Sequence, residues 1–223
     1  MCPNALYPPV DTRSTNCTIQ TQYLRAIFTM ASLAESAGVR TVNRKLILIG
    51  FRGVGKTSLV RRFVDKEFGP EDQYVPTIEQ SFKKSVRIEN IVFKTEVIDT
   101  AGKDEYATFS RQASVGAHGY IFVYSVTSQS SLDQLIKVRE NLLNLIGSDT
   151  VPIVLVAQKC DLNEREISSA VGVQLAKEWN CPLLNVSAKM NVNIDKVFDT
   201  MLRLIEKDSG LLQPGKKPSC KIL

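Results

Sequence analysis

The chain has 223 residues, of which 43% are hydrophobic and 23% charged, which is enough for one globular domain with a sizeable core and tails. Its net charge of +5 is small, and Lys and Arg alternate with Asp and Glu, so we expect no nucleic-acid partner. Five cysteines without metal-ligand spacing argue against a disulfide framework, and no apolar run reaches the roughly 18 residues of a membrane-spanning helix.

The first 43 residues are rich in Thr, Ser, Asn and Pro and show no sustained hydrophobic period. Such a composition buries too little apolar surface to order the chain, so we expect a disordered N-terminal extension over residues 1–43. Met30 opens a segment that leads directly into the domain. The sequence leaves open whether the protein begins at Met1 or at Met30.

From residue 44 to residue 208, aliphatic or β-branched runs alternate with helical patterns. Two neighbouring runs, 81–89 and 91–98, meet at a tight turn at Asn90 and predict a hairpin with one antiparallel edge strand. The alternation predicts an α/β fold with a mostly parallel six-stranded sheet and helices on both faces. The other predicted strands cover 45–49, 120–126, 153–157 and 182–186, and the predicted helices cover 56–65, 132–145, 166–179 and 194–206.

A complete phosphate-binding motif follows the first predicted strand. Residues 50–57 match Gly-x-x-x-x-Gly-Lys-Ser/Thr in the strand-to-helix context that this motif requires. Its glycines let backbone N–H groups point at phosphate oxygens, Lys56 supplies a charge for the β and γ phosphates, and Thr57 is the expected Mg²⁺ ligand. Asp99, at the end of a strand, is the expected carboxylate for the metal, although such a residue alone is usually a turn or cap. The predicted phosphate contacts are Arg52, Gly53, Val54, Gly55, Lys56, Thr57 and Ser58.

Two short motifs at the ends of later strands favour guanine over adenine. The Asp161 carboxylate can accept hydrogen bonds from the guanine N1–H and 2-amino group, a donor pair that adenine lacks. The Lys159 stem can lie on the base, the Ala188 N–H can donate to the guanine carbonyl oxygen, and Ser187 can brace the carboxylate. Either motif alone is equally compatible with ordinary loop chemistry. The predicted base contacts are Gln158, Lys159, Asp161, Leu162, Ser187, Ala188 and Lys189.

With these motifs in this order, the region 44–208 resembles a small GTPase of the Ras family. The resemblance also rests on Tyr-Val-Pro-Thr-Ile-Glu at 74–79 and Asp-Thr-Ala-Gly-Lys-Asp-Glu-Tyr at 99–106. Features most similar to the Rheb branch are Arg52, Pro-Thr-Ile-Glu and the segments 119–121 and 123–128. The resemblance implies a P-loop NTPase fold of the Ras-like G-domain type, GTP and GDP as bound nucleotides, and Mg²⁺ as cofactor.

The resemblance also implies roles in two switch segments. Thr77 would close switch I on Mg²⁺ and the γ-phosphate, and the Gly102 N–H in switch II would sense that phosphate. Phe68 would pack beside the base, and Tyr74 would be a further nucleotide contact. Effector proteins would bind switch I, residues Tyr74–Gln80, and switch II, while exchange factors and GTPase-activating proteins regulate the cycle. The implied catalytic residues are Lys56, Thr77, Gly102 and Lys103, and the implied metal ligands are Thr57, Thr77 and Asp99.

Several departures from the Ras pattern bear on mechanism. Lys103 stands where the family has a glutamine that both accepts from and donates to the attacking water, and an ammonium group has no acceptor. Arg52 replaces a glycine, and its long side chain can crowd the position of the catalytic glutamine, which predicts slow turnover. An equally good interpretation is that the Rheb-like branch tolerates an arginine there. Gln158 replaces an asparagine, so we expect weaker nucleotide affinity that is not abolished. Five residues, 69–73, precede Tyr74, two more than in typical Ras, which lengthens switch I.

Two functions fit these features. The first is a GTPase that hydrolyses GTP to GDP and phosphate, slowly, and acts as a molecular switch in signal transduction at a membrane surface. The alternative is a hydrolysis-poor scaffold that stays loaded with GTP and binds effectors constitutively. A P-loop kinase for another nucleotide would leave Asp161 and the Ser187-Ala188-Lys189 motif unexplained.

The C-terminal tail, residues 209–223, is rich in Gly, Pro and Lys, and we expect it to be flexible. It ends in Cys220-Lys221-Ile222-Leu223, which fits the prenylation pattern, and the terminal leucine favours a geranylgeranyl group. A prenyltransferase is therefore an expected partner, and Cys220 the expected lipidation site. We expect the protein on the cytoplasmic face of a membrane, and in the cytosol when it is not anchored.

Overall fold

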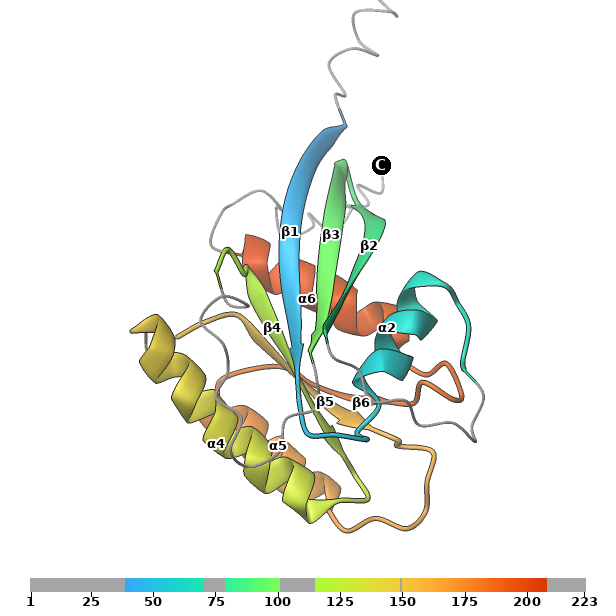
Figure 1. Cartoon of the computed structure of the whole chain (residues 1–223), viewed down its shortest axis with the longest axis vertical. Helices are drawn as coiled ribbons and strands as arrows, with labels where there is room; N and C mark the ends of the chain where they lie inside the picture. The colour runs from blue at the N-terminus through green and yellow to red at the C-terminus, as the bar shows by residue number, and fades with distance from the viewer. Residues whose placement is uncertain (1–38, 70–78, 101–114, 149, 208–223) are drawn as a thin grey trace, which may run out of the picture. The chain divides into compact units, whose positions relative to one another are not determined.

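The structure, a computed structural model, describes residues 39–69, 79–100, 115–148 and 150–207. Six strands form one sheet in the order β2-β3-β1-β4-β5-β6 (Figure 1). The strands are β1 (Arg40–Ile49), β2 (Glu79–Ile88), β3 (Ile91–Thr100), β4 (Gly119–Ser125), β5 (Ile153–Gln158) and β6 (Leu183–Val186). The described helices are α2 (Lys56–Val64), α4 (Gln129–Ile146), α5 (Ser169–Glu178) and α6 (Ile194–Glu206).

The strand pairing confirms the predicted α/β fold with one antiparallel edge strand. β1, β4, β5 and β6 pair in parallel, whereas β2 pairs antiparallel with β3 and lies at the edge of the sheet. The hairpin closes where Ile88 faces Ile91, and Glu89 in its turn has a φ of 55°. Because the parallel strands point the same way, the loops after β1, β5 and β6 all leave from one edge of the sheet.

The first strand begins earlier than predicted. β1 starts at Arg40, so residues 40–43, which we assigned to a disordered extension, belong to the sheet. The physical reason is tertiary: Val42 packs against a small buried cluster that includes Phe93 of β3 and Leu202 of α6. The strand is therefore extended by packing partners that lie far away in the sequence.

The core lies on both faces of the sheet, as the alternation within β1 requires. Leu46 and Leu48 contact the cluster that α2 and α6 complete, whereas Ile47 and Ile49 contact the cluster that α4 and α5 complete. Figure 1 shows the same grouping, with α4 beside α5 and α6 across the sheet. None of the described helices combines the length and apolarity needed to cross a bilayer.

Candidate functional site

Residues 50–55 join β1 to α2 and form a tight loop that only particular residues permit. Gly55 has a φ of 99° at the start of α2, a left-handed conformation that favours glycine. A Cβ at Gly50 would lie 2.2 Å from the Val123 carbonyl oxygen of β4, which is too close for any side chain. The loop thus lies tightly against the sheet. It leads directly into the N-terminus of α2, where N–H groups attract anions.

Lys56, the first residue of α2, places its ammonium group inside this loop. Its Nζ donates to the carbonyl oxygens of Gly50 at 2.8 Å and Phe51 at 3.0 Å. Burial lowers the pKa of Lys56 to about 8, and the charge of Asp99 opposes this shift. Because burial disfavours the charged ammonium, an anion held in the loop would stabilise it.

Thr57 and Asp99 bring two oxygen donors together beside the loop. The Thr57 hydroxyl donates to Asp99 Oδ2 at 2.5 Å, and the Asp99 side chain is fully buried. Burial raises the pKa of Asp99, while the Thr57 hydrogen bond and the Lys56 charge oppose the shift. The second carboxylate oxygen, Oδ1, is buried without a hydrogen-bond partner in the described part of the chain.

This donor set fits Mg²⁺, which prefers carboxylate and hydroxyl oxygens and keeps several waters. An orphaned buried carboxylate oxygen is the feature that a cation would satisfy. Within residues 39–69, 79–100, 115–148 and 150–207 there is no cluster of three or more acidic, His or Cys side chains. A metal there would therefore take few protein ligands, and phosphate oxygens and water would complete its coordination.

Gln158, the last residue of β5, connects the predicted base-binding region to the phosphate loop. Its Nε2 donates to the Gly55 carbonyl at 3.3 Å, and its Oε1 is buried with no partner among the described residues. The longer glutamine side chain thus still reaches the loop that an asparagine holds in the family pattern. One amide oxygen is left unsatisfied, which is a cost that a bound ligand could remove.

The segment after β5 carries Lys159, Asp161 and Leu162 toward solvent. Lys159 has a φ of 65°, and the next residue donates its N–H to the Val186 carbonyl of β6 at 3.1 Å, which joins the ends of the two strands. Asp161 and Leu162 are exposed. The Arg165 guanidinium donates to the Cys160 carbonyl at 2.9 Å and so helps to fix this segment. No sequence pattern points to this role of Arg165.

The segment after β6 forms a short closed loop. Ser187 and Val192 exchange two backbone hydrogen bonds, and the Ser187 hydroxyl accepts the Met190 N–H at 3.0 Å. Ser187 and Ala188 are buried. We expected Ser187 to brace Asp161, but its described hydrogen bonds stay inside the loop.

Of the remaining predicted residues, some are described by the structure and others are not. Phe68 packs against the core cluster of α2 and α6, and the exposed Arg52 lies 5.7 Å from the centre of the Phe51 ring. Gly53, Val54 and Ser58 lie in or directly beside the loop. Five predicted residues lie outside the described part of the chain: Tyr74, Thr77, Gly102, Lys103 and Cys220.

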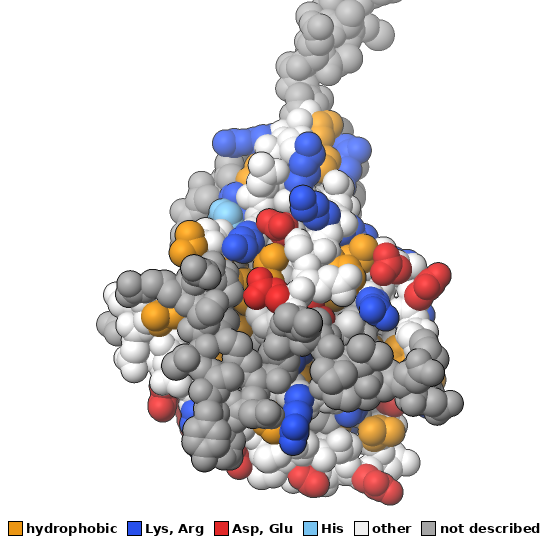
Figure 2. Space-filling view, in the orientation of Figure 1, with side chains coloured by type: hydrophobic (Ala, Val, Ile, Leu, Met, Phe, Trp, Pro, Cys, Tyr) orange, Lys and Arg blue, Asp and Glu red, His pale blue; other side chains and the backbone are white. Residues whose placement is uncertain are grey.

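A separate basic cleft of about 490 Å³ lies on the strands β1, β2 and β3. Figure 2 shows Lys and Arg side chains gathered over this part of the viewed face. None of the predicted phosphate or base contacts lines it. The residues that line it are Asn43, Arg44, Lys45, Lys83, Lys84, Ser85, Lys94, Thr95, Glu96 and His118.

Comparison with known proteins gives a consistent result. A model of the Ras family matches residues 45–207. The chain is 41% identical over 182 residues to "GTP-binding protein Rheb homolog" of Dictyostelium discoideum, which covers 81% of this chain and 97% of that protein. It is 40% identical over 182 residues to "GTP-binding protein Rheb" of Homo sapiens, with the same coverage. It is also 40% identical over 167 residues to "Ras-like protein 1" of Saccharomyces cerevisiae, covering 74% of this chain and 53% of that protein.

Gly50→Ala tests the close approach of the loop to β4. Because the new Cβ would meet a backbone oxygen at 2.2 Å, we expect the free energy of unfolding to fall by about 1–3 kcal/mol, measured by urea denaturation. Gly69→Ala is the matched control, since its nearest neighbour would be the Arg61 guanidinium at 3.9 Å. Equal stabilities of the two variants would contradict this account of the loop.

Proposed function

This chain belongs to the Ras family of small GTP-binding switch proteins, in its Rheb branch, and from that premise we propose how its own residues bind and use the nucleotide. Members of the family bind GTP and GDP and hydrolyse GTP. The observation that carries the proposal is the Gln158–Gly55 hydrogen bond, because it joins the end of β5, where the base motif begins, to the phosphate loop. Both parts of one nucleotide can then occupy a single continuous site.

We propose that the loop binds the phosphates of the nucleotide and that the segments after β5 and β6 bind its base. Backbone N–H groups of residues 53–57 and the Lys56 ammonium hold the β and γ phosphates. Asp161 accepts from the guanine N1–H and 2-amino group, and the Ala188 N–H donates to the guanine carbonyl oxygen. Adenine would leave the Asp161 acceptors unpaired, and this cost is the source of selectivity.

Mg²⁺ is proposed as the cofactor, with Thr57 and Asp99 beside it. Bound there, it would neutralise phosphate charge. The support is the buried, unpartnered Oδ1 of Asp99 and the nearby Thr57 hydroxyl. Thr77 is the proposed further ligand, by resemblance.

Ras-family proteins generally interact with effectors, exchange factors and GTPase-activating proteins. We propose that Thr77 and Gly102 sense the γ-phosphate, so that switch I (Tyr74–Gln80) and switch II change with the bound nucleotide and effectors read the difference. β2 begins at Glu79, so the end of switch I continues directly into the edge strand of the sheet. That edge strand would transmit the state of the switch to a partner surface.

Slow hydrolysis is proposed from the chemistry of Lys103 and Arg52. A lysine offers donors and no acceptor, so it cannot orient the attacking water as a glutamine does. Arg52 is exposed on the loop and adds bulk on the approach to the γ-phosphate. If hydrolysis is nearly absent, the protein would instead be a constitutively loaded scaffold, and these same two residues are what favour that second function.

Membrane attachment is proposed through Cys220. The C-terminal Cys-Lys-Ile-Leu supports modification by a prenyltransferase, and Lys216 and Lys217 would add attraction to anionic lipids. One prenyl chain with a short basic segment gives reversible binding. The protein would then work on the cytoplasmic face of a membrane and return to the cytosol when released.

Guanine selectivity is the direct test of the site. We expect GDP and GTP to bind the purified chain far more tightly than ADP and ATP in titration calorimetry. Asp161→Asn should shift preference toward xanthine nucleotides, because an amide can donate to the xanthine 2-oxygen. Asp133→Asn, an exposed aspartate on α4, should leave the preference unchanged. Comparable affinities of the wild-type protein for GTP and ATP would rule out the proposed base site.

Hydrolysis is tested by restoring the family residues. Lys103→Gln should raise single-turnover GTP hydrolysis by about tenfold or more, because an amide can both accept from and donate to the attacking water. Arg52→Gly should be measured alone and in combination. If both residues act on one catalytic geometry, the double variant should exceed the product of the single effects. Ordinary Ras-type turnover in the wild type, unchanged by Lys103→Gln, would remove the case for the scaffold.

Attachment is tested by cell fractionation of the full chain. Cys220→Ser should move the protein from the membrane pellet to the soluble fraction, because it removes the thiol that would carry the prenyl group. Cys17→Ser is the matched control and should behave like the wild type. Equal membrane recovery of the Cys220→Ser variant would reject the proposed anchor.

A further inference from the structure

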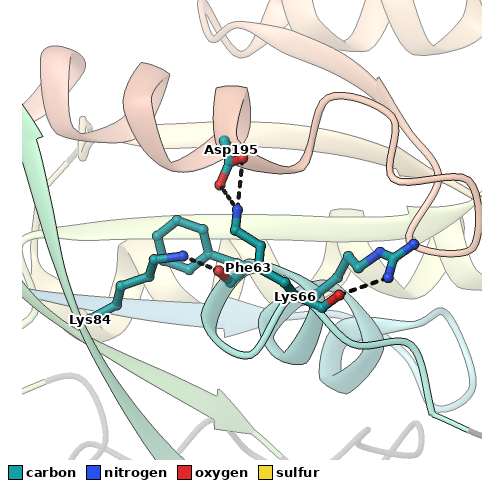
Figure 3. Close-up of polar contacts among 5 residues, drawn as sticks. Phe63, Lys66, Lys84 and Asp195 are labelled. Atoms are coloured by element: carbon teal, nitrogen blue, oxygen red, sulfur yellow. Dashed lines mark hydrogen bonds and ion pairs between the residues drawn. The ribbon is translucent and has the colours of Figure 1, made fainter.

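Three cationic side chains converge on the C-terminal end of α2. Lys84 of β2 donates to the Phe63 carbonyl and lies 4.3 Å from the centre of the Phe63 ring. Lys66 pairs with both carboxylate oxygens of Asp195, in the first turn of α6, at 2.7 and 2.9 Å. Figure 3 shows both contacts at the end of the helix. Cations are favourable here because the last carbonyls of a helix carry partial negative charge.

The third cation, Arg62, reaches two segments at once. Its Nη1 donates to the Lys66 carbonyl at 2.9 Å, and its Nη2 donates to the Lys189 carbonyl at 3.3 Å. Lys66 follows α2 with a φ of 62°, and two residues later comes Phe68, the proposed neighbour of the base. Lys189 is in the closed loop after β6, directly after Ala188, the proposed donor to the guanine carbonyl oxygen.

We propose that Arg62 is a positioning residue that clamps the two segments on either side of the guanine base and thereby sets how long the nucleotide stays bound. This inference rests on the proposed guanine site. Arg62 itself does not touch the base; it acts through the backbones of residues 66–68 and 187–189. Loss of the clamp would let the two segments separate and release the nucleotide sooner.

The chemistry requires an arginine. A planar guanidinium presents donors in a fixed fork, so one side chain can hold two carbonyl oxygens that belong to segments 123 residues apart in the chain, Lys66 and Lys189. The side chain is half-buried at the end of α2, so fixing it in one conformation costs less conformational entropy than it would for a fully exposed side chain. A lysine has a single nitrogen at its tip and would favour one carbonyl at a time.

The contacts within the closed loop, residues 187–192, show why a hydrogen bond from α2 matters. Its base is closed by the Ser187–Val192 bridge, and the Ser187 hydroxyl holds the Met190 N–H. These contacts shape the loop but do not tie it to α2. The Arg62–Lys189 hydrogen bond does, because it holds the carbonyl of Lys189, the residue that follows Ala188.

The experiment measures dissociation of GDP from the full chain in MgCl₂ buffer, with excess GTP as competitor. Arg62→Ala should release GDP about tenfold faster, which corresponds to about 1.4 kcal/mol. Arg62→Lys should give an intermediate rate. One control, Arg61→Ala, on the adjacent exposed position, should stay within about twofold of the wild type.

A second readout separates clamping from general destabilisation. In 6-thio-GDP a sulfur, a poorer acceptor, replaces the oxygen that Ala188 is proposed to contact, so the wild type should release it faster than GDP. In Arg62→Ala this difference should shrink, because the Ala188 contact is already misplaced. An unchanged ratio with both nucleotides released faster would mean that Arg62 only stabilises the domain, and would overturn the clamp.

The remaining outcomes also decide the matter. Unchanged GDP release in Arg62→Ala, with the wild type binding GDP normally, would overturn the clamp and leave the proposed function intact. No GDP binding by the wild type would overturn both. If Arg62→Ala does not fold, the same two ratios measured on Arg62→Lys decide, since that variant keeps the charge and loses the two-carbonyl fork.

Discussion

The burial of two opposite charges at one edge of the sheet is the constraint around which this protein is built. Lys56 and Asp99 are both buried. Burial lowers the pKa of the lysine and raises the pKa of the aspartate, and both shifts favour the neutral form. Each finds only part of what its charged form requires: two backbone carbonyls for the ammonium, one hydroxyl for the carboxylate. A ligand that brings phosphate and a cation together would supply the rest, so its binding would relieve a cost that folding has imposed.

The fold keeps this site in one piece through backbone contacts rather than through side chains alone. Gly50 lies so close to Val123 that the phosphate loop has no room to move toward β4. Gln158 holds Gly55 from the base side, and the N–H of Cys160 joins the end of β5 to Val186 of β6. The proposed phosphate and base contacts are therefore positioned by the same sheet edge, as is usual where parallel strands end.

The departures from the Ras pattern differ in kind. Gln158 donates a hydrogen bond to the Gly55 carbonyl, and its other amide atom, Oε1, is buried and unpaired among the described residues, a cost that a bound ligand could remove. Arg52 is exposed and lies near the Phe51 ring, so its side chain is on the outer surface of the loop. Both of these departures that the structure describes thus leave the phosphate loop in place.

The sequence by itself determined the order of strands and helices, the phosphate loop and the two base motifs, because each depends on residues that are neighbours in the chain. It also predicted the hairpin, from a tight turn at Asn90 between two neighbouring runs. It did not predict that β1 begins at Arg40, since Val42 packs there against the buried cluster that includes Phe93 and Leu202. The same limit applies to Arg165 and Arg62. The contacts that give them their roles here are to backbone carbonyls, which every residue has, so no pattern of side chains marks them. Only the tertiary structure decides which carbonyls a guanidinium can reach.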